Sequence, residues 1–149
     1  MLEDNKEKEN MCLLYVNNYH FEMICLPYIR KCLKENKKVK ILTQENLENE
    51  VSKILTIMKL NNEEENEILN LDWKEKTELN IETLKDEGII FVKGKENYIE
   101  NLDKKLEKFK NIQIIDCYNL EDMNSNNIGI ISKYTKILST NGIEAISAN

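Results

Sequence analysis

Nine residues that could contact a ligand follow the predicted strands of this chain. Their side chains are amides, hydroxyls, carboxylates, aromatic rings and one imidazole, which are the groups that orient small molecules in protein sites. In a parallel α/β sheet, ligands bind outside the carboxyl ends of the strands, so these residues form the predicted ligand-binding site. They are Asn17, Asn18, Tyr19, His20, Thr43, Asp72, Trp73, Asp116 and Tyr118.

Each candidate also has a structural interpretation. Trp73 is the only tryptophan and His20 the only histidine, and single residues of these types are more often packed than functional. Asp72 and Asp116 could bind a cation or a hydroxyl, or could cap the next helix. Lys93 and Lys95 flank a glycine, which is typical of a turn that receives an anion or of a solvated turn.

Motifs of the common nucleotide-binding enzymes are missing from the sequence. Neither GxxxxGK[ST] nor GxGxxG occurs, so a phosphate-binding loop and a dinucleotide fingerprint are excluded. A phosphoreceiver domain needs an acidic cluster after its first strand, where this chain has Asn17 and Asn18. No catalytic residue and no metal ligand is therefore assigned, and no cofactor is expected.

The elements that must position these residues alternate between strand and helix patterns. Apolar runs predict strands at 11–16, 39–42, 68–73, 89–92 and 112–117, with a short edge strand at 143–146. Such alternation with short connections is typical of right-handed crossover units. The predicted fold is a three-layer α/β/α sandwich, with a mainly parallel sheet of about five strands and helices on both faces.

Apolar residues at helical spacing predict helices between these strands. The first helix contains Pro27, which indicates either a kinked helix or a loop that ends at residue 26; the kinked helix is favoured. Thr43 is predicted to cap the second helix, residues 61–67 to form a solvated link, and Asn80 to cap a short helix that ends at Gly88. A last helix is predicted from Ile130 to Gly142.

Composition narrows the class of protein and its partners. The chain has 149 residues, of which 41% are hydrophobic and 32% charged, which is typical of one folded domain over 11–149 after a flexible leader at 1–10. A net charge of −6 disfavours nucleic acid and anionic lipid as partners. No apolar run approaches the roughly 18 residues of a membrane span.

The cysteines indicate a reducing compartment. Cys12, Cys25, Cys32 and Cys117 lie within or beside apolar runs and never form a CxxC pair. This pattern favours buried, reduced thiols over a disulfide framework or a zinc site, and the polar N-terminus does not resemble a secretory signal. We therefore expect a cytoplasmic protein.

The stretch CLLYVNNYHFEMICLPYIRKCLKENKKVKILTQENLENEVSKIL resembles the MEDS sensory domain. The resemblance rests on a strand ending in an aromatic residue, a polar turn, an amphipathic helix, a lysine-rich hinge and a strand ending in threonine. It implies a RecA/KaiC-like α/β domain that lacks the phosphate loop and senses small organic molecules. The family usually carries an output domain, which this chain is not expected to contain, so a separate partner protein would report the bound state.

Three functions remain open on the sequence. The first is a non-catalytic regulatory or sensory domain that binds a small molecule or a regulatory protein at the strand ends. The second is a protein-interaction scaffold without a ligand, for instance a homodimer. The third is a metal-assisted enzyme that uses Asp72 or Asp116.

Overall fold

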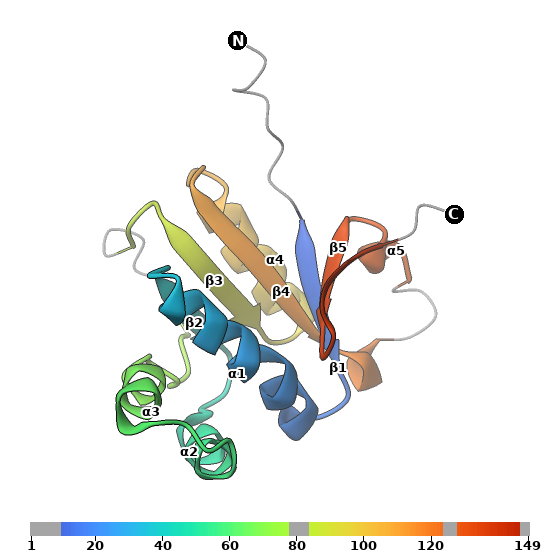
Figure 1. Ribbon diagram of the computed structural model, residues 1–149. Coiled ribbons are helices and arrows are strands. Elements are labelled where there is room, and N and C mark those ends of the chain that lie inside the picture. The colour runs from blue at the N-terminus through green and yellow to red at the C-terminus, as the bar shows by residue number, and fades with distance from the viewer. Residues whose placement is uncertain (1–9, 78–83, 124–127, 147–149) are drawn as a thin grey trace.

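The computed structural model describes residues 10–77, 84–123 and 128–146. Its centre is a six-stranded sheet in the order β2-β3-β4-β1-β5-β6 (Figure 1). All neighbouring strands are parallel except β5 and β6, which are antiparallel. The strands are β1 (Met11–Tyr15), β2 (Val39–Thr43), β3 (Gly88–Lys93), β4 (Ile112–Asn119), β5 (Lys136–Ser139) and β6 (Gly142–Ala145).

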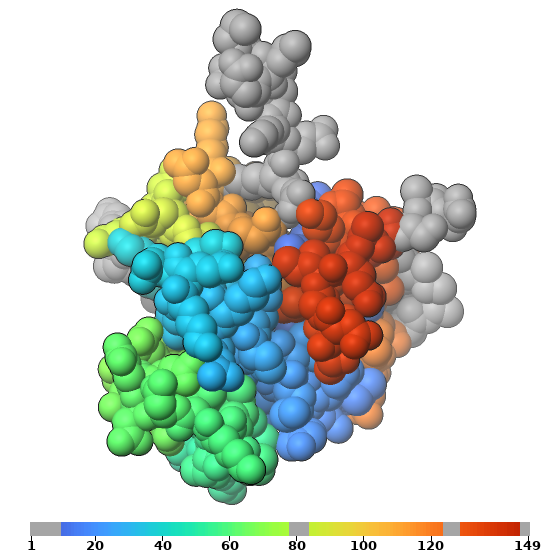
Figure 2. Space-filling view, in the orientation of Figure 1, coloured from blue at the N-terminus to red at the C-terminus, as the bar shows by residue number. Residues whose placement is uncertain are grey.

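Side chains on the two faces of the sheet enter separate apolar cores. One face, which we call the α1 side, packs against the first three helices; the other, the α4 side, packs against the last two. Figure 2 views the α1 side, where α1 lies between the α2–α3 pair and the β5–β6 hairpin. The predicted α/β fold with a mainly parallel sheet is confirmed, with six strands where about five were expected. The helices are α1 (Asn18–Lys34), α2 (Glu48–Ile57), α3 (Asn62–Leu69), α4 (Glu96–Leu106) and α5 (Ile128–Ile131).

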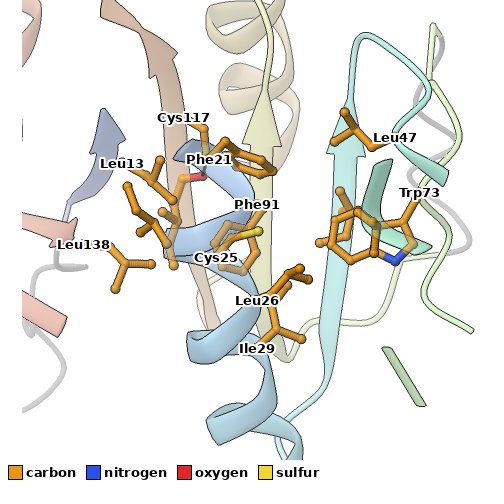
Figure 3. Packing of buried hydrophobic residues seen from close by; sticks show 14 of the residues in the cluster. Leu13, Phe21, Cys25, Leu26, Ile29, Leu47, Trp73, Phe91, Cys117 and Leu138 are labelled. Atoms are coloured by element: carbon orange, nitrogen blue, oxygen red, sulfur yellow. Dashed lines mark hydrogen bonds between the residues drawn. The ribbon is translucent and has the colours of Figure 1, made fainter. Parts of the chain in front are cut away.

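The first helix continues through its proline, as the kinked-helix prediction required. Pro27 is exposed, whereas Phe21, Cys25 and Ile29 are fully buried against the sheet on either side of it (Figure 3). Burial of this continuous stripe offsets the missing backbone hydrogen bond, which costs about 3 kcal/mol in a helix interior. The alternative, a helix that begins at Pro27, is wrong.

The region between β2 and Trp73 differs most from the prediction. Residues 61–67 are not a solvated link, because Asn61 and Glu64 form a capping box that starts α3. Residues 68–73 are not a strand: Ile68 lies in α3 and Trp73 follows it in an irregular segment. A short apolar run has no intrinsic preference between helix and strand, and here the cap decides.

Two predicted caps also have other roles. Thr43 ends β2 and is buried, while α2 begins at Glu48, so Thr43 does not cap that helix. Gly88 has the predicted left-handed φ, +104°, but it opens β3 instead of ending a helix. A Cβ at this position would lie 2.5 Å from the Lys38 carbonyl oxygen, so the close approach of β2 requires glycine. Asn80 lies outside the described residues.

The C-terminal region forms a β-hairpin where a helix was predicted. Ile137 and Leu138 belong to β5, which pairs with β1, and the edge strand predicted at 143–146 is β6 (Gly142–Ala145). Ile130 and Tyr134 do pack inward, on the α4 side. Gly142 has a φ of +103°, which suits the tight turn between β5 and β6. In the described part of the chain, no helix has the length and apolar character needed to cross a bilayer.

Candidate functional site

The turn after β1 is closed by its own hydrogen bonds. The His20 amide donates to Asn17 Oδ1 over 2.8 Å, and the Val16 amide donates to His20 Nδ1 over 3.0 Å. His20 Nδ1 is therefore an acceptor, so the neutral ring carries its proton on Nε2. Asn17 is the N-cap of α1, and Tyr19 is 58% exposed. Asn17 therefore caps the helix and His20 bonds to the backbone before it, so both side chains are engaged within the turn.

A buried lysine occupies the strand ends beside this turn. The Lys93 side chain is 3% exposed, and its ammonium lies 2.8 Å from Glu45 Oε1. The same ammonium lies 4.8 Å from the centre of the Tyr15 ring and 5.2 Å from that of Phe21. Lys93 was predicted to lie in a turn, where it would be solvated or receive an anion; instead it is buried between two aromatic faces and a carboxylate of the protein itself.

An acidic residue is buried next to Lys93. Glu22 on α1 is 2% exposed, and its Oε2 has no hydrogen-bond partner among the described residues. Burial, together with the nearby Glu50 carboxylate, raises the pKa of Glu22 to about 7. Asn18 donates to Glu50 Oε2 over 3.2 Å. The strand ends on the α1 side thus hold the Lys93–Glu45 ion pair and, beside it, the buried carboxyl group of Glu22.

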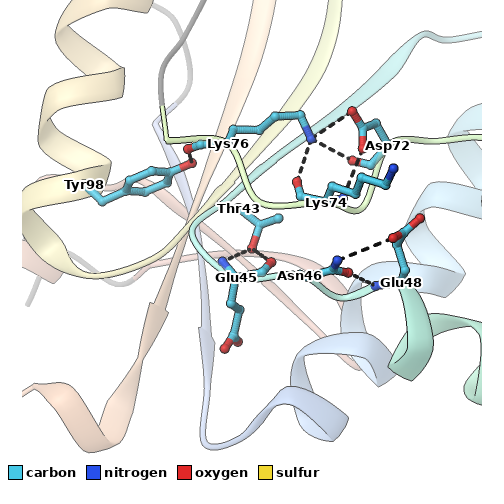
Figure 4. Close-up of polar contacts among 8 residues, drawn as sticks. All are labelled: Thr43, Glu45, Asn46, Glu48, Asp72, Lys74, Lys76 and Tyr98. Atoms are coloured by element: carbon cyan, nitrogen blue, oxygen red, sulfur yellow. Dashed lines mark hydrogen bonds and ion pairs between the residues drawn. The ribbon is translucent and has the colours of Figure 1, made fainter.

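Three further predicted residues have structural contacts near β2. The Thr43 hydroxyl donates to the Glu45 carbonyl, and Asp72 pairs with Lys76 at 3.2 Å (Figure 4). Trp73 is 1% exposed in the core of the α1 side (Figure 3). Its indole N–H donates to the Ile68 carbonyl. Its burial agrees with the packed alternative for this residue.

The remaining two predicted residues, Asp116 and Tyr118, lie together on the α4 side. Alternate residues of β4 point to one face, so Asp116 and Tyr118 share this face with Ile114. Asp116 meets residues of α4 and of the segment before β5 around a cavity of about 400 Å³. We call this cavity the acidic groove; its lining residues are Asn10, Met11, Asp103, Glu107, Ile114, Asp116, Lys133 and Tyr134.

Two carboxyl groups meet in the acidic groove, and each has one buried oxygen. Asp116 is 4% exposed, and its Oδ1 and the Oδ1 of Asp103 are both buried without a hydrogen-bond partner among the described residues. Two ionised carboxylates cannot satisfy each other, because both only accept hydrogen bonds. One proton between them would satisfy both oxygens, so the pair holds a shared proton.

The electrostatics of this carboxyl pair follow from burial. Burial, the hydrogen bond to Asp116 and the Asp116 charge raise the pKa of Asp103 to about 10. Burial also raises the pKa of Asp116, while hydrogen bonds from Asp103 and Tyr134 offset part of the rise. Asp103 therefore keeps its proton at neutral pH and can donate it to Asp116, so the pair does not carry two negative charges.

Two tyrosines extend the hydrogen bonds of the pair. Tyr134 donates to Asp116 Oδ2 over 2.7 Å, and the hydroxyls of Tyr118 and Tyr134 lie 2.6 Å apart. Burial raises the pKa of both phenols, so both stay protonated. Since Tyr134 gives its proton to Asp116, Tyr118 donates to Tyr134. This chain fixes the orientation of Asp116 at the floor of the groove.

Sequence reasoning missed Asp103 and assigned Tyr134 to a helix that in fact ends at Ile131. Asp103 lies at helical spacing from Ile99 and Leu106, which are fully buried on α4. A carboxylate on an apolar helical stripe is the signal that could have identified it. Nothing local links Tyr134 to Asp116, because β4 and the segment before β5 meet only in the fold.

The described side chains offer little support for metal binding or for thiol chemistry. In the described ranges no three His, Cys, Asp or Glu side chains are grouped so as to hold a metal ion. Asp72 is exposed near β2, while Asp116 is buried on the opposite side of the sheet. The cysteines are buried and free, and burial, with the Asp116 charge, raises the pKa of Cys12 to about 12. Thiolates of this kind do not form at neutral pH.

A second cavity, of about 440 Å³, lies at the amino ends of β2 and β3. Its walls are apolar, and its charged residues are four lysines and one glutamate. It contains none of the predicted site residues and no carboxyl pair. Its lining is therefore opposite in charge to that of the acidic groove.

Comparison of the chain with family models, with curated proteins and with solved structures found no match.

Proposed function

We propose that this protein is a non-catalytic regulatory domain that binds a small molecule in the acidic groove. The observation that carries this proposal is the buried Asp103–Asp116 pair at the wall of an open cavity of about 400 Å³. Cavities of about 300–1,000 Å³ with a few converging polar groups are typical of small-molecule sites. Strongly perturbed carboxyl groups in a cleft are also typical of functional sites.

The groove contains Asp116 of the predicted site but lies apart from the strand ends around Asn17–His20 and Thr43. At those ends Lys93, Glu45 and Glu22 fill the space beside the turn, and Asn17 and His20 bond to each other. A ligand there would have to displace the ion pair of Lys93. A ligand in the acidic groove would need no such displacement, which favours the groove.

A sensory role agrees with the resemblance of residues 11–58 to the MEDS domain. That resemblance implies binding of small organic molecules by a domain without a phosphate loop, and the sequence has no such loop. The site would report through a separate regulatory partner protein. We place this role in the cytoplasm, because buried, free cysteines suit a reducing compartment.

A protein contact is the second candidate, and exposed apolar side chains favour it. Val16, Tyr19 and Met23 follow one another at helical spacing around the start of α1 and are 41%, 58% and 39% exposed. Such a patch is typical of a contact with a regulatory partner or with a second copy. Size-exclusion chromatography with light scattering tests it: a dimer that Tyr19→Ser converts to a monomer supports it, and a monomer at high concentration contradicts self-association.

The proposed ligand site is tested by thermal-shift screening of a metabolite library, followed by calorimetry on the stabilising compounds. We expect Asp116→Asn and Tyr134→Phe to remove the stabilisation, because both residues line the groove. His20→Ala, at the strand ends, is the matched control and should retain it. Loss of the ligand effect in His20→Ala alone, or no stabilising compound in the library, would contradict the acidic groove as the site.

A further inference from the structure

The two unpartnered oxygens of the acidic groove require a hydrogen-bond donor. Asp103 Oδ1 and Asp116 Oδ1 are buried acceptors, and Asp116 Oδ2 is already bonded to Tyr134. An unsatisfied buried acceptor costs about 1–3 kcal/mol in general, and more when it is charged. Among the described residues no donor bonds to either oxygen, and one proton shared by the pair would serve both. A ligand that reaches the pair can replace that proton with N–H groups of its own.

We infer that the acidic groove binds a small organic cation whose primary ammonium group takes the place of the proton shared by Asp103 and Asp116, with the two side chains rotating apart to admit it. This inference rests on the function proposed above and names the class of its ligand. An ammonium has three donors, so it can serve both Oδ1 atoms and keep one donor for water or for Glu107. Glu107 follows Asp103 by one turn of α4 and also lines the groove.

The charges of the groove favour a cation. Three of its lining residues are acidic and one, Lys133, is basic. With one proton on the pair, the lining carries a net charge of about −1, and loss of that proton makes it about −2. An anionic ligand would meet repulsion from Asp116 and Glu107. The lysine-lined cavity near β2 is the place where an anion would bind more favourably.

The apolar residues of the groove indicate which chemical groups the rest of the ligand can carry. Met11 and Ile114 contribute hydrocarbon to the lining, and the ring of Tyr134 offers a face that can attract a cation. These groups suit a short alkyl body attached to the ammonium. The volume of about 400 Å³ is that of a small-molecule site and not of a polymer groove.

The exchange balances in charge and in protons. A singly protonated pair and one R–NH₃⁺ give a doubly ionised pair that holds R–NH₃⁺, and one proton leaves to solvent. The other charged or titratable groups around the pair are Glu100 on α4, Glu107 at the C-cap of α4, Tyr118 on β4, Cys12 on β1, and Lys133 and Tyr134 before β5. None of them needs to change its protonation for this exchange.

Calorimetry with n-butylammonium as the probe tests the inference, with 1-butanol as the neutral match and butyrate as the anionic one. We expect only the cation to bind, with release of about one proton at pH 7, read from the difference in heat between phosphate and MOPS buffers. Its affinity should increase up to about tenfold for each unit of pH between 6 and 8.

Two variants test whether the carboxyl pair is responsible for cation binding and for proton release. Asp103→Asn keeps a donor for Asp116 but removes the exchangeable proton, so affinity should fall by about tenfold or more and proton release should disappear. Asp122→Asn makes the same replacement at an exposed residue outside the groove and should leave the affinity and the proton release unchanged. If Asp103→Asn does not fold, proton release by the wild-type protein still decides the matter.

Failure of this inference differs from failure of the proposed function. Equal binding of n-butylammonium and 1-butanol, or binding without proton release, would overturn the ammonium exchange. A neutral metabolite whose stabilisation depends on Asp116 would also overturn it, while leaving a ligand site in the groove. The absence of any compound that depends on Asp116 or Tyr134 would overturn both.

Discussion

The hydroxyl of Tyr134 donates a hydrogen bond to Asp116 Oδ2 over 2.7 Å. This bond joins β4 to the segment that leads into β5, so it contributes to stability as well as to the groove. Removing the hydroxyl leaves a buried carboxylate oxygen without a partner. We expect Tyr134→Phe to lower the free energy of unfolding by about 1–3 kcal/mol, measured by urea denaturation.

The control for this change is Tyr19→Phe, which removes a hydroxyl from a side chain that is 58% exposed. Its free energy of unfolding should stay within about 0.5 kcal/mol of the wild type. Equal losses in the two variants would mean that the bond between Tyr134 and Asp116 contributes nothing specific.

The carboxyl pair predicts how stability depends on pH. The pKa of Asp103 is about 10 in the folded protein and is near its ordinary value of 3.8 when the chain unfolds. Between these values the folded state binds more protons than the unfolded state, so stability decreases as pH rises. Urea denaturation at pH 5, 7 and 9 should show a steady loss, and Asp103→Asn should flatten the profile.

Glu22 should also make stability decrease as pH rises, but over a narrower range of pH. Its pKa is raised to about 7 from 4.5, so its contribution to stability is lost as pH rises between these values. Glu22→Gln should flatten the profile between pH 5 and 7 and leave the slope from pH 7 to 9 in place. A profile that neither variant alters would show that these acids are not the protonated groups.

The buried ion pair of Lys93 and Glu45 predicts unequal effects of its two partners. Lys93→Met keeps the hydrocarbon volume and removes the charge, so stability should change by less than about 1 kcal/mol or increase. Glu45→Ala leaves the ammonium of Lys93 buried without its carboxylate and should cost about 1–3 kcal/mol, less than for a fully buried pair because Glu45 is 53% exposed. In thermal denaturation, Glu45→Ala should therefore unfold at a lower temperature than Lys93→Met.

Alanine substitutions at three glycines distinguish the cost of steric crowding from the cost of backbone strain. Gly88→Ala meets the Lys38 carbonyl at 2.5 Å and has a φ of +104°, whereas Gly142→Ala has a φ of +103° in open space. We expect Gly88→Ala to cost about 2 kcal/mol or more and Gly142→Ala about 1 kcal/mol. Gly129→Ala, which meets nothing within 4 Å, should be neutral or slightly stabilising. Equal losses of stability in Gly88→Ala and Gly142→Ala would exclude a role for the contact with Lys38.

Some residues of the candidate site could be predicted from local sequence patterns, whereas others come together only through tertiary contacts. Asp116 and Tyr118 could be predicted because they follow an apolar run that had to be a strand. Asp103 could have been recognised from its spacing to Ile99 and Leu106 on α4. Tyr134 could not, since its partner Asp116 comes from a strand with which it shares no local pattern.

The sequence by itself determined β1 to β4 and the helices α1, α2 and α4, because each carries a long apolar run or a regular helical stripe. Only the tertiary structure decided the short ambiguous runs. Ile68 became helical because Asn61 caps α3, and Ile137 joined a strand because β1 and β6 lie beside it. The same packing buried Asp103 against Asp116, and no sequence pattern states how deeply two carboxyl groups will be removed from water.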